Sequence, residues 1–540
     1  MSAYQYPLLI KQLLAAPIAR RSGEEIIFRD RLRYDYPTLA ARVGRLGSAL
    51  TALGVRQGDV VGVMDWDSHR YLESFFAIPM LGATLMTVNI RLAPEQIAYT
   101  INHAEVTVLF CHTDFLPVLR AIRGELPKLR TVIVLTDSAE VPAEGVDGEY
   151  EALLATGDPA HEFPDFDEGT RATTFYTTGT TGLPKGVYFS HRQLVLHTLS
   201  VLVALTLPGT GQGISDRDVY MPLTPMFHVH AWGFPYAATM AGMKQVYPGR
   251  YQPDVIVRLV RDEKVSVSHC VPTILQMVLA AADEHKVDLS GWKVVIGGSA
   301  LPKALAQAAL DRGVNTFTGY GMSETCPVLS IAHLRPEMIG DKAAELDART
   351  KAGLPVPLVD LRIVDHDMQS LPRDGVATGE IVARAPWLTQ GYTGNPEASE
   401  ELWEGGYLHT KDIGRIRPDG YLEITDRIKD VIKTGGEWVS SLQLEDIILQ
   451  VPCVAEVAVI GIKDERWGER PLVLAVPRQG MEIDPEAIRA HVASYADKKV
   501  LPRYAIPENI LVVESLARTS VGKLDKKALR AMYGAQFEVA

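Results

Sequence analysis

The sequence predicts an α/β fold: a large N-terminal domain of stacked, parallel-rich βα sheets with a small β subdomain, followed by a small α+β C-terminal domain. Short apolar runs alternate with helical patterns over the first 330 residues. After about residue 355 the apolar runs become shorter, and Gly, Pro and Asp separate them. Apolar strands that alternate with helices are typical of parallel sheets covered on both faces, so we expect ligands beyond the carboxyl ends of these strands.

The alternation of strands and helices can be followed along the first part of the chain. Residues 1–21 lack a basic segment before their apolar stretch, which favours an opening amphipathic helix over a signal peptide and leaves a cleaved organelle presequence as the alternative. The expected strands are 59–64, 83–89, 106–111, 131–136, 265–270, 292–297 and 314–319. The expected helices are 69–80, 115–124, 272–283 and 302–313.

Shorter elements follow in the last third of the chain. The expected strands of the β subdomain are 358–364, 380–385, 414–417 and 421–425. A compact α+β unit then contains the expected strands 454–460, 472–476 and 510–513, with helices that begin at Pro485 and Lys526. We place the boundary near Lys429, which divides the chain into domains 1–428 and 429–540.

The composition excludes several classes of protein. Lys and Arg number 54 against 66 Asp and Glu, a net charge of −12, whereas a general nucleic-acid binder carries a basic surface. Four cysteines without a CxxC pair argue against a zinc ribbon or a disulfide framework and fit a reducing compartment such as the cytoplasm. The sequence has no run of about 18 apolar residues, so we expect no integral membrane segment.

The clearest chemical signal is TTGTTGLPKG at residues 177–186. Its glycines allow backbone N–H groups to approach an anion, while threonine hydroxyls and one lysine add donors and charge, a combination that suits a polyphosphate. The Walker A pattern fails, because Pro184 and Gly186 occupy its glycine and hydroxyl positions. Residues 186–191, GVYFSH, are typical of a strand, so we expect a loop between two strands, with an ordinary flexible turn as the alternative.

The same segment resembles the signature loop of the adenylate-forming superfamily, which includes acyl-CoA synthetases, luciferases and the adenylation domains of peptide synthetases. Further motifs resemble those of this family in the expected order: YGMSET at 320–325, YLHTKDIG at 407–414, DRIKDVIKTGGE at 426–437 and RTSVGK at 518–523. The resemblance implies binding of ATP, Mg²⁺ and coenzyme A, and a C-terminal domain that is mobile.

The resemblance also implies a set of nucleotide-binding residues: Thr177, Thr178, Gly179, Thr180, Thr181, Lys185, Gly298, Ser299, Thr318, Gly319, Tyr320, Gly321, Ser323, Thr325, Asp412 and Arg427, with Lys433, Gly435, Gly436 and Trp438 in one domain orientation. Tyr320 would stack on adenine, and Asp412 would accept the ribose hydroxyls. Thr181 and Glu324 would hold Mg²⁺. For Trp438, packing between the domains is an equal alternative.

Four residues are implied in catalysis: Lys523, His228, Glu324 and Lys429. Lys523 would bridge the attacking carboxylate and the α-phosphate, although Lys526 and Lys527 beside it leave open a solvated lysine. The C-terminal domain would then rotate about Lys429, so that a thiolate can attack the acyl-adenylate. Val521 and Ser520 depart from the small hydroxyl or proline that often flanks the family's lysine.

The implied substrate pocket contains Phe227, His228, Trp232 and Gly298. Phe227 and His228 would lie on a helix beside the acyl group, with Trp232 one turn further along. The HxH pattern of residues 228–230 also fits a pair of metal ligands or a core histidine, and the lack of a third ligand at a suitable spacing disfavours the metal.

The segments GGSAL and GMSET do not fit the GxSxG pattern of a serine hydrolase, so the sequence disfavours that class of enzyme.

These observations predict an ATP-dependent acid–CoA ligase that forms an acyl-AMP and then an acyl-CoA. GGEWVSS at 435–441 resembles members that act on medium- and long-chain fatty acids, and aryl or short substituted acids are the alternative. A stand-alone adenylation enzyme that loads a carrier protein and a non-catalytic binding protein are the other hypotheses. A homodimer is expected only by analogy with the family.

Overall fold

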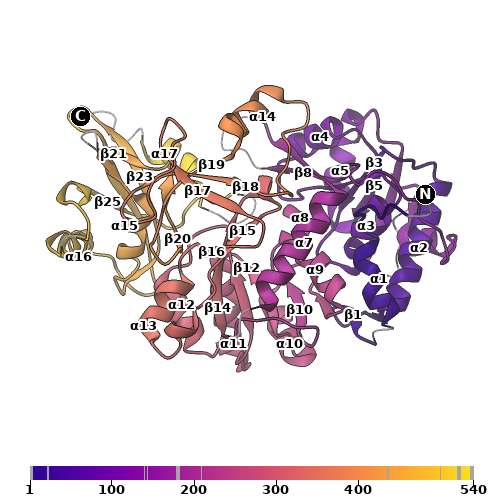
Figure 1. The fold of residues 1–540 in the computed structure, drawn as a ribbon, viewed down its shortest axis with the longest axis horizontal. Coiled ribbons are helices and arrows are strands. Elements are labelled where there is room, and N and C mark those ends of the chain that lie inside the picture. Colours follow the sequence, from indigo (N-terminus) through magenta and orange to yellow (C-terminus); the bar gives the residue numbers. More distant parts are fainter. Residues whose placement is uncertain are drawn as a thin grey trace.

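The computed structural model describes residues 4–534 except 21–22, 139, 141, 143, 178–182, 208–209, 435–436, 499 and 520–523. Two large sheets form the N-terminal part, and a four-stranded and a five-stranded sheet follow them along the chain. Figure 1 shows the elements from β21 onward at one end of the molecule and the helices α1 and α2 towards the other. The predicted α/β class is therefore confirmed.

The first large sheet has seven strands in the order β7-β6-β5-β3-β4-β8-β9. Its strands are β3 Val60–Met64, β4 Thr84–Thr87, β5 Val106–His112, β6 Thr131–Leu135, β7 Gly148–Glu149, β8 Arg171–Thr177 and β9 Lys185–Ser190. All neighbours are parallel except β8 and β9. The four strands expected between residues 59 and 136 are confirmed.

The second large sheet has nine strands in the order β16-β15-β14-β13-β12-β10-β11-β1-β2. Its strands are β1 Glu25–Phe28, β2 Leu32–Asp35, β10 Val219–Pro222, β11 Lys244–Tyr247, β12 Val267–Cys270, β13 Lys293–Ile296, β14 Asn315–Gly321, β15 Val328–Ile331 and β16 Leu354–Pro355. The antiparallel hairpin β1–β2 joins this sheet through the parallel pair β1–β11, a pairing that the sequence did not predict.

Helices cover the two large sheets: α1 Gln12–Ala19, α2 Tyr36–Ala52, α3 His69–Met80, α4 Pro94–His103, α5 Leu116–Ile122, α6 Tyr150–Ala155, α7 His191–Thr206, α8 Val229–Trp232, α9 Phe234–Ala241, α10 Pro253–Glu263, α11 Pro272–His285, α12 Lys303–Leu310 and α13 Lys342–Arg349. Helix α3, which the sequence predicts with the same bounds, is buried along its whole length. It contacts β1 of one sheet and β3, β4 and β8 of the other, so it packs between the sheets.

The β subdomain is an antiparallel sheet of β17 Asp360–Val364, β18 Gly379–Arg384, β19 Leu408–Ile416 and β20 Leu422–Arg427, with α14 Pro396–Leu402 between β18 and β19. The expected strand 414–417 is only the end of the longer β19. The last unit contains β21 Ile432–Thr434, β22 Glu437–Val439, β23 Val454–Asp464, β24 Gly468–Pro477, β25 Asn509–Val512, α15 Ser441–Ile448, α16 Pro485–Asp497 and α17 Lys526–Tyr533. The division at residues 428 and 429 falls between β20 and β21 and stays a prediction.

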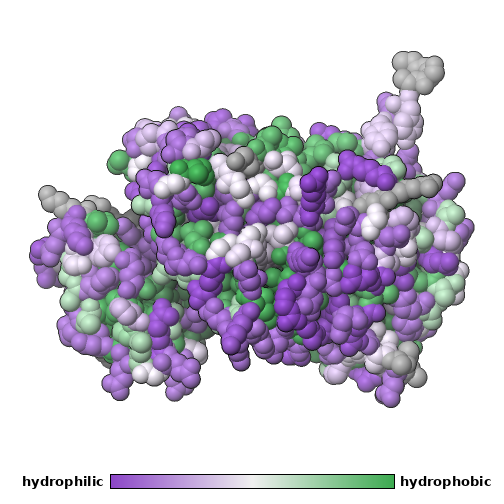
Figure 2. Space-filling view, turned by 90° about the horizontal axis from the view of Figure 1, so that it is seen from below, coloured by the Kyte–Doolittle hydropathy of each residue, from purple (hydrophilic) through white to green (hydrophobic). Residues whose placement is uncertain are grey.

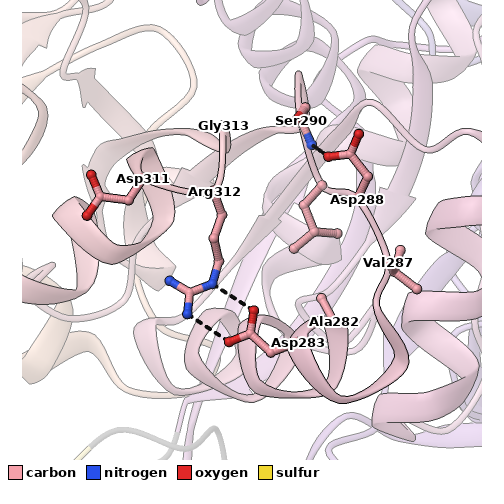
Figure 3. Close-up of a pocket in the computed structure, with 9 residues that line it drawn as sticks. Ala282, Asp283, Val287, Asp288, Ser290, Asp311, Arg312 and Gly313 are labelled. Atoms are coloured by element: carbon pink, nitrogen blue, oxygen red, sulfur yellow. Dashed lines mark hydrogen bonds and ion pairs between the residues drawn. The ribbon is translucent and has the colours of Figure 1, made fainter.

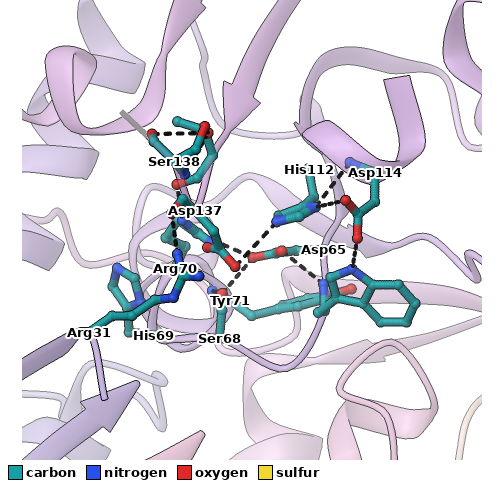
Figure 4. Close-up of polar contacts among 12 residues, drawn as sticks. Arg31, Asp65, Ser68, His69, Arg70, Tyr71, His112, Asp114, Asp137 and Ser138 are labelled. Atoms are coloured by element: carbon teal, nitrogen blue, oxygen red, sulfur yellow. Dashed lines mark hydrogen bonds and ion pairs between the residues drawn. The ribbon is translucent and has the colours of Figure 1, made fainter. Parts of the chain in front are cut away.

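A buried cluster of charged residues lies at the carboxyl ends of β3, β5 and β6 (Figure 4). The Arg70 guanidinium lies 2.7 Å from the Asp137 carboxylate and 3.5 Å from Asp65. Burial alone would lower the pKa of His112, but Asp137 raises it. The cationic and anionic groups thus partner each other, which fits a structural role in tying the three strands together.

Polar side chains dominate the face of the molecule in Figure 2, with smaller apolar areas between them. Among the residues that the structure describes, none of the helices has the length and apolar character to cross a bilayer.

Candidate active site

The predicted phosphate loop joins the two strands at one edge of the seven-stranded sheet. β8 ends at Thr177, and its antiparallel partner β9 begins at Lys185, directly opposite Thr177. The prediction of a loop between two strands is confirmed. Thr178, Gly179, Thr180 and Thr181 lie outside the described residues, whereas Lys185 is half-buried at the base of the loop.

Three of the predicted nucleotide-binding residues are in contact. The Tyr320 hydroxyl donates a hydrogen bond of 2.8 Å to Oδ2 of Asp412. Arg427 Nε lies 3.1 Å from Oδ1 of the same carboxylate, and Asp412 raises the pKa of Arg427. Tyr320 is on β14, while Asp412 and Arg427 face each other on β19 and β20, so the site joins the nine-stranded sheet to the β subdomain.

The predicted magnesium carboxylate, Glu324, is buried in a short 3₁₀ turn, Ser323–Thr325, that follows β14. Burial raises its pKa, while the Tyr392 hydroxyl, which donates to Oε1 at 2.7 Å, and the charges of Lys185 and Arg427 oppose this change. Glu324 therefore lies close enough to feel the charges of Lys185, at the base of the predicted phosphate loop, and of Arg427, which pairs with Asp412. Tyr392 also lies under the Lys185 ammonium, and the sequence motifs did not single it out.

The other predicted nucleotide contacts on and after β14 are two threonines that bond to the backbone and three half-buried residues. The Thr318 hydroxyl donates to the Arg349 carbonyl at 2.8 Å, and the Thr325 hydroxyl donates to the Met322 carbonyl at 3.0 Å. Both hydroxyls therefore hold the backbone in this structure. The remaining predicted nucleotide contacts here, Gly319, Gly321 and Ser323, are half-buried.

The glycine-rich segment after β13 lies next to the predicted substrate pocket. The Trp232 indole packs against the backbone of Gly297, and its ring centroid lies 5.1 Å from that of His269. Gly298 follows with φ +80°, a left-handed conformation that favours glycine, and Ser299 is exposed. Trp232 therefore connects the predicted acyl side of the site to the predicted adenine side.

The expectation of a right-handed helix through Phe227, His228 and Trp232 is wrong. All four residues of α8 have left-handed backbone angles, with φ between 47° and 59°, and Gly233 continues them at 75°. Such angles cost about 1 kcal/mol or more for each residue with a β-carbon. Trp232 is therefore not one turn along a helix from His228, which is half-buried and precedes the left-handed turn.

His230 of this turn is buried among aromatic rings. The centroids of Phe75, Phe175, Phe189 and Tyr236 lie 5.3 to 6.3 Å from its own. Burial lowers the pKa of His230 to about 3, so the imidazole is neutral at physiological pH. These surroundings make the turn an apolar element of the core.

The segment that leads into the turn is anchored on the seven-stranded sheet. The buried Asp67 carboxylate accepts from the Met226 backbone N–H at 2.8 Å and from the Tyr251 hydroxyl at 2.5 Å. Burial raises the pKa of Asp67 to about 7. The Thr87 hydroxyl donates to the Phe227 carbonyl at 2.8 Å. Phe227 is consequently buried and held from two sides.

The predicted hinge carries a buried polar cluster across the proposed domain boundary. Asp426 accepts from the N–H and the hydroxyl of Ser441 at 2.6 and 2.7 Å. The Lys526 ammonium lies 2.6 Å from Ser441 Oγ and 2.7 Å from Glu445 Oε1. Lys429, between the two sides, is exposed, and partial desolvation together with Arg427 lowers its pKa. We name Asp426, Ser441, Glu445 and Lys526 the hinge cluster.

Only part of the predicted hinge region is described. Lys433 is described and is exposed on β21. Gly435, Gly436, Lys523 and the side chain of Trp438 lie outside the described residues. The two ends of the loop that contains Lys523 are described. Arg518 and Leu524 form a β-bridge, and the Asp525 N–H donates to the Ala517 carbonyl, so these contacts close the loop at its ends.

A surface pocket of about 340 Å³ lies away from these residues, between the end of α11 and the end of α12 (Figure 3). Its lining residues precede β13 and β14, so it lies at the amino ends of these strands, whereas ligands of parallel sheets bind at the carboxyl ends. Arg312 in this pocket pairs with Asp283 at 2.7 Å. The pocket therefore does not belong to the candidate active site.

Comparisons with known proteins agree with this geometry. Residues 15–393 match the family described as AMP-binding enzyme, and residues 443–523 match the AMP-binding enzyme C-terminal domain. The chain is 41% identical to a long-chain-fatty-acid–CoA ligase of Thermus thermophilus over 93% of this chain and 90% of the relative. It is 37% identical to a 3-methylmercaptopropionyl-CoA ligase of Ruegeria lacuscaerulensis over 97% of each chain.

Among solved structures, the anthranilate CoA ligase AuaEII in complex with anthranoyl-AMP superposes with a TM-score of 0.86 at 25% identity, over 99% of both chains. The fold, the ordered motifs and these matches over nearly the full length lead to one conclusion. The chain belongs to the family of AMP-binding enzymes, where it groups with the AMP-forming acid–CoA ligases.

Proposed function

We propose that the enzyme activates medium- or long-chain fatty acids, or similar aliphatic acids, in two steps at the site described above. The carboxylate first attacks the α-phosphate of ATP, which releases pyrophosphate and forms an acyl-AMP. The thiol of coenzyme A then attacks the acyl carbonyl and releases AMP. The observation that carries this proposal is the convergence of Lys185, Glu324 and the Tyr320–Asp412–Arg427 group in one site.

The first step needs two anions to meet, so its catalysis depends on positioning and charge neutralisation. Lys185 and the loop of residues 177–181 would hold the terminal phosphates. Tyr320 and Asp412 would fix the adenosine, with Gly298, Ser299, Thr318 and Gly319 around the base. Lys523 would bridge the carboxylate and the α-phosphate, where charge develops in the transition state.

The residues present fit a magnesium ion. Glu324 is a buried carboxylate beside the predicted phosphate site, and Mg²⁺ is usually bound by one or two carboxylates together with water and substrate phosphates. Glu324 and Thr181 would hold the ion, whose charge would neutralise the phosphates.

The second step needs space for the pantetheine arm of coenzyme A. We propose that residues 429–540 rotate about Lys429 between the steps, so that Lys523 leaves the site and residues 433–438 approach it. The hinge cluster spans this boundary, and rotation would separate Asp426 from Ser441.

The acid would bind beside Phe227, His228 and Trp232. The apolar surroundings of the left-handed turn and the similarity to a long-chain-fatty-acid–CoA ligase support an aliphatic substrate. The similarity to a 3-methylmercaptopropionyl-CoA ligase supports a short substituted acid as the second candidate. We further propose a cytoplasmic enzyme, in agreement with the four free cysteines, and a homodimer.

The test is pyrophosphate exchange into ATP with a panel of acids of increasing chain length, followed by detection of acyl-CoA and AMP. Lys523→Ala should lower acyl-AMP formation by several orders of magnitude and still convert supplied acyl-AMP to acyl-CoA. Equal loss of both steps would contradict the role of Lys523. Absence of exchange with every acid would contradict the proposed function.

A further inference from the structure

Tyr392 lies between two residues of the proposed nucleotide site, and none of the motifs includes it. We propose that Tyr392 is a positioning residue that holds Lys185 and Glu324 in a fixed arrangement around the phosphates of ATP. This inference rests on the proposed function, because it assumes that both residues face the nucleotide.

The hydroxyl group of Tyr392 acts on Glu324. It donates to Oε1 at 2.7 Å, and the acceptor carboxylate is buried. Hydrogen bonds to charged groups are about twice as strong as those between neutral groups. A carboxylate fixed at one oxygen keeps its plane, so the hydroxyl determines the direction in which the other oxygen points.

The ring of Tyr392 acts on Lys185. The ammonium nitrogen lies 4.7 Å from the ring centroid, within the range of a cation–π interaction. Lysine has a flexible stem, and an aromatic face that attracts its ammonium restricts the positions it can take. The two contacts use different parts of the same side chain, so they can be removed separately.

The backbone around Tyr392 is fixed to both sides of the site. Tyr392 forms a β-bridge with Val187 of β9, and the Thr393 N–H donates to the Gly186 carbonyl at 2.8 Å. Three residues earlier, the Thr389 N–H donates to the backbone carbonyl of Glu324 at 3.0 Å. Residues 389–393 therefore attach the strand of Lys185 to the turn of Glu324 independently of the Tyr392 side chain.

The experiment measures ATP binding to the full-length protein by calorimetry, with Mg²⁺ and with a chelator. Tyr392→Phe keeps the ring, so ATP binding in the chelator should equal that of the wild type, while the gain in affinity from Mg²⁺ should fall about tenfold. Tyr392→Leu also removes the aromatic face, so ATP binding in the chelator should weaken about threefold or more. Tyr392→Met replaces Tyr392→Leu if the latter does not fold.

Tyr495→Phe is the matched control. The Tyr495 hydroxyl donates to Gln450 at 2.5 Å, and the Lys498 ammonium lies 5.2 Å from the Tyr495 ring centroid, but the residue is on α16. This variant should bind ATP as the wild type does in both conditions.

Two results would overturn the assignment of Tyr392: an undiminished gain from Mg²⁺ in Tyr392→Phe, or equal ATP binding by Tyr392→Phe and Tyr392→Leu in the chelator. If the wild type neither binds ATP nor exchanges pyrophosphate, the proposed function fails as well. If the wild type does both and Tyr392→Phe matches it, only the role of Tyr392 fails.

Discussion

The Trp232 indole lies so close to Gly297 that a β-carbon at position 297 would come within 2.8 Å of Cη2. The same β-carbon would lie 2.9 Å from the Gly319 carbonyl oxygen. Contacts this short force a side chain or the backbone to move, and overpacking of this kind costs about 1–3 kcal/mol. Gly297 thus allows the predicted acyl and adenine sides of the site to touch.

The first prediction follows from this contact. Gly297→Ala should lower the stability of the protein by about 1–3 kcal/mol and raise the KM for ATP, because Trp232 and the segment after β13 are displaced. Trp232→Leu in the same chain should restore part of the loss, since the indole is then gone and only the Gly319 contact remains. Kinetics and urea unfolding of both single variants and the double variant check this. Additive effects in the double variant would show that the two residues do not interact.

The second prediction concerns the pH dependence of stability. Asp67 has a pKa of about 7 in the folded protein against an ordinary value of 3.8, so between these two values the folded state binds more protons than the unfolded state. The contribution of Asp67 to the free energy of unfolding therefore falls as pH rises from about 4 to about 7 and stays constant above. At about 1.4 kcal/mol per pH unit, the full loss is of the order of 4 kcal/mol.

Asp67→Asn removes this titration and keeps an oxygen that can accept from Met226. The difference in unfolding free energy between variant and wild type, measured in urea at pH 5, 6, 7 and 8, should move in favour of the variant up to about pH 7. Arg91 and Asp65 also act on the Asp67 carboxyl, and both stay in place in the variant. A difference that does not change with pH would refute the prediction. Asp262→Asn, at an exposed site, serves as the control.

The third prediction concerns the hinge cluster. Lys526→Met leaves the buried Glu445 carboxylate without its cation, and breaking a buried ion pair on one side costs about 3–5 kcal/mol. The double variant Lys526→Met/Glu445→Gln should be more stable than Lys526→Met alone. Lys527→Met, at the exposed neighbour on α17, should change stability by less than about 0.5 kcal/mol. Urea unfolding measures all three, and similar losses for the two lysine variants would contradict the burial argument.

Elements with a strong local pattern could be predicted from the sequence. Helix α3 and the four strands between residues 59 and 136 are short apolar or helical patterns that follow one another along the chain, and the structure has them where the pattern puts them. The pairing of β1 with β11 could not be predicted, because Ile26 and Gln245 are more than 200 positions apart and the local sequence of a strand does not specify which strand it pairs with.

The candidate site could likewise be predicted from the sequence only in part. Motifs located Lys185, Glu324 and Asp412, since each lies in a short segment with an unusual composition. Tyr392 lies in no such segment, and only its position between Lys185 and Glu324 reveals it. The left-handed turn after His228 was missed because VHAW contains no glycine, the usual sign of positive φ; tertiary packing overrides the local preference.

The segment 389–393 has a consequence for folding and handling of the chain. β9 is the last strand of its sheet, and an uncovered edge strand offers unpaired N–H and C=O groups to other molecules. Residues 389–393 cover part of that edge through Val187, Gly186 and the Tyr188 carbonyl. A chain shortened before residue 389 would lose this cover and should aggregate by edge-to-edge pairing, so fragments for crystallisation or expression should retain it.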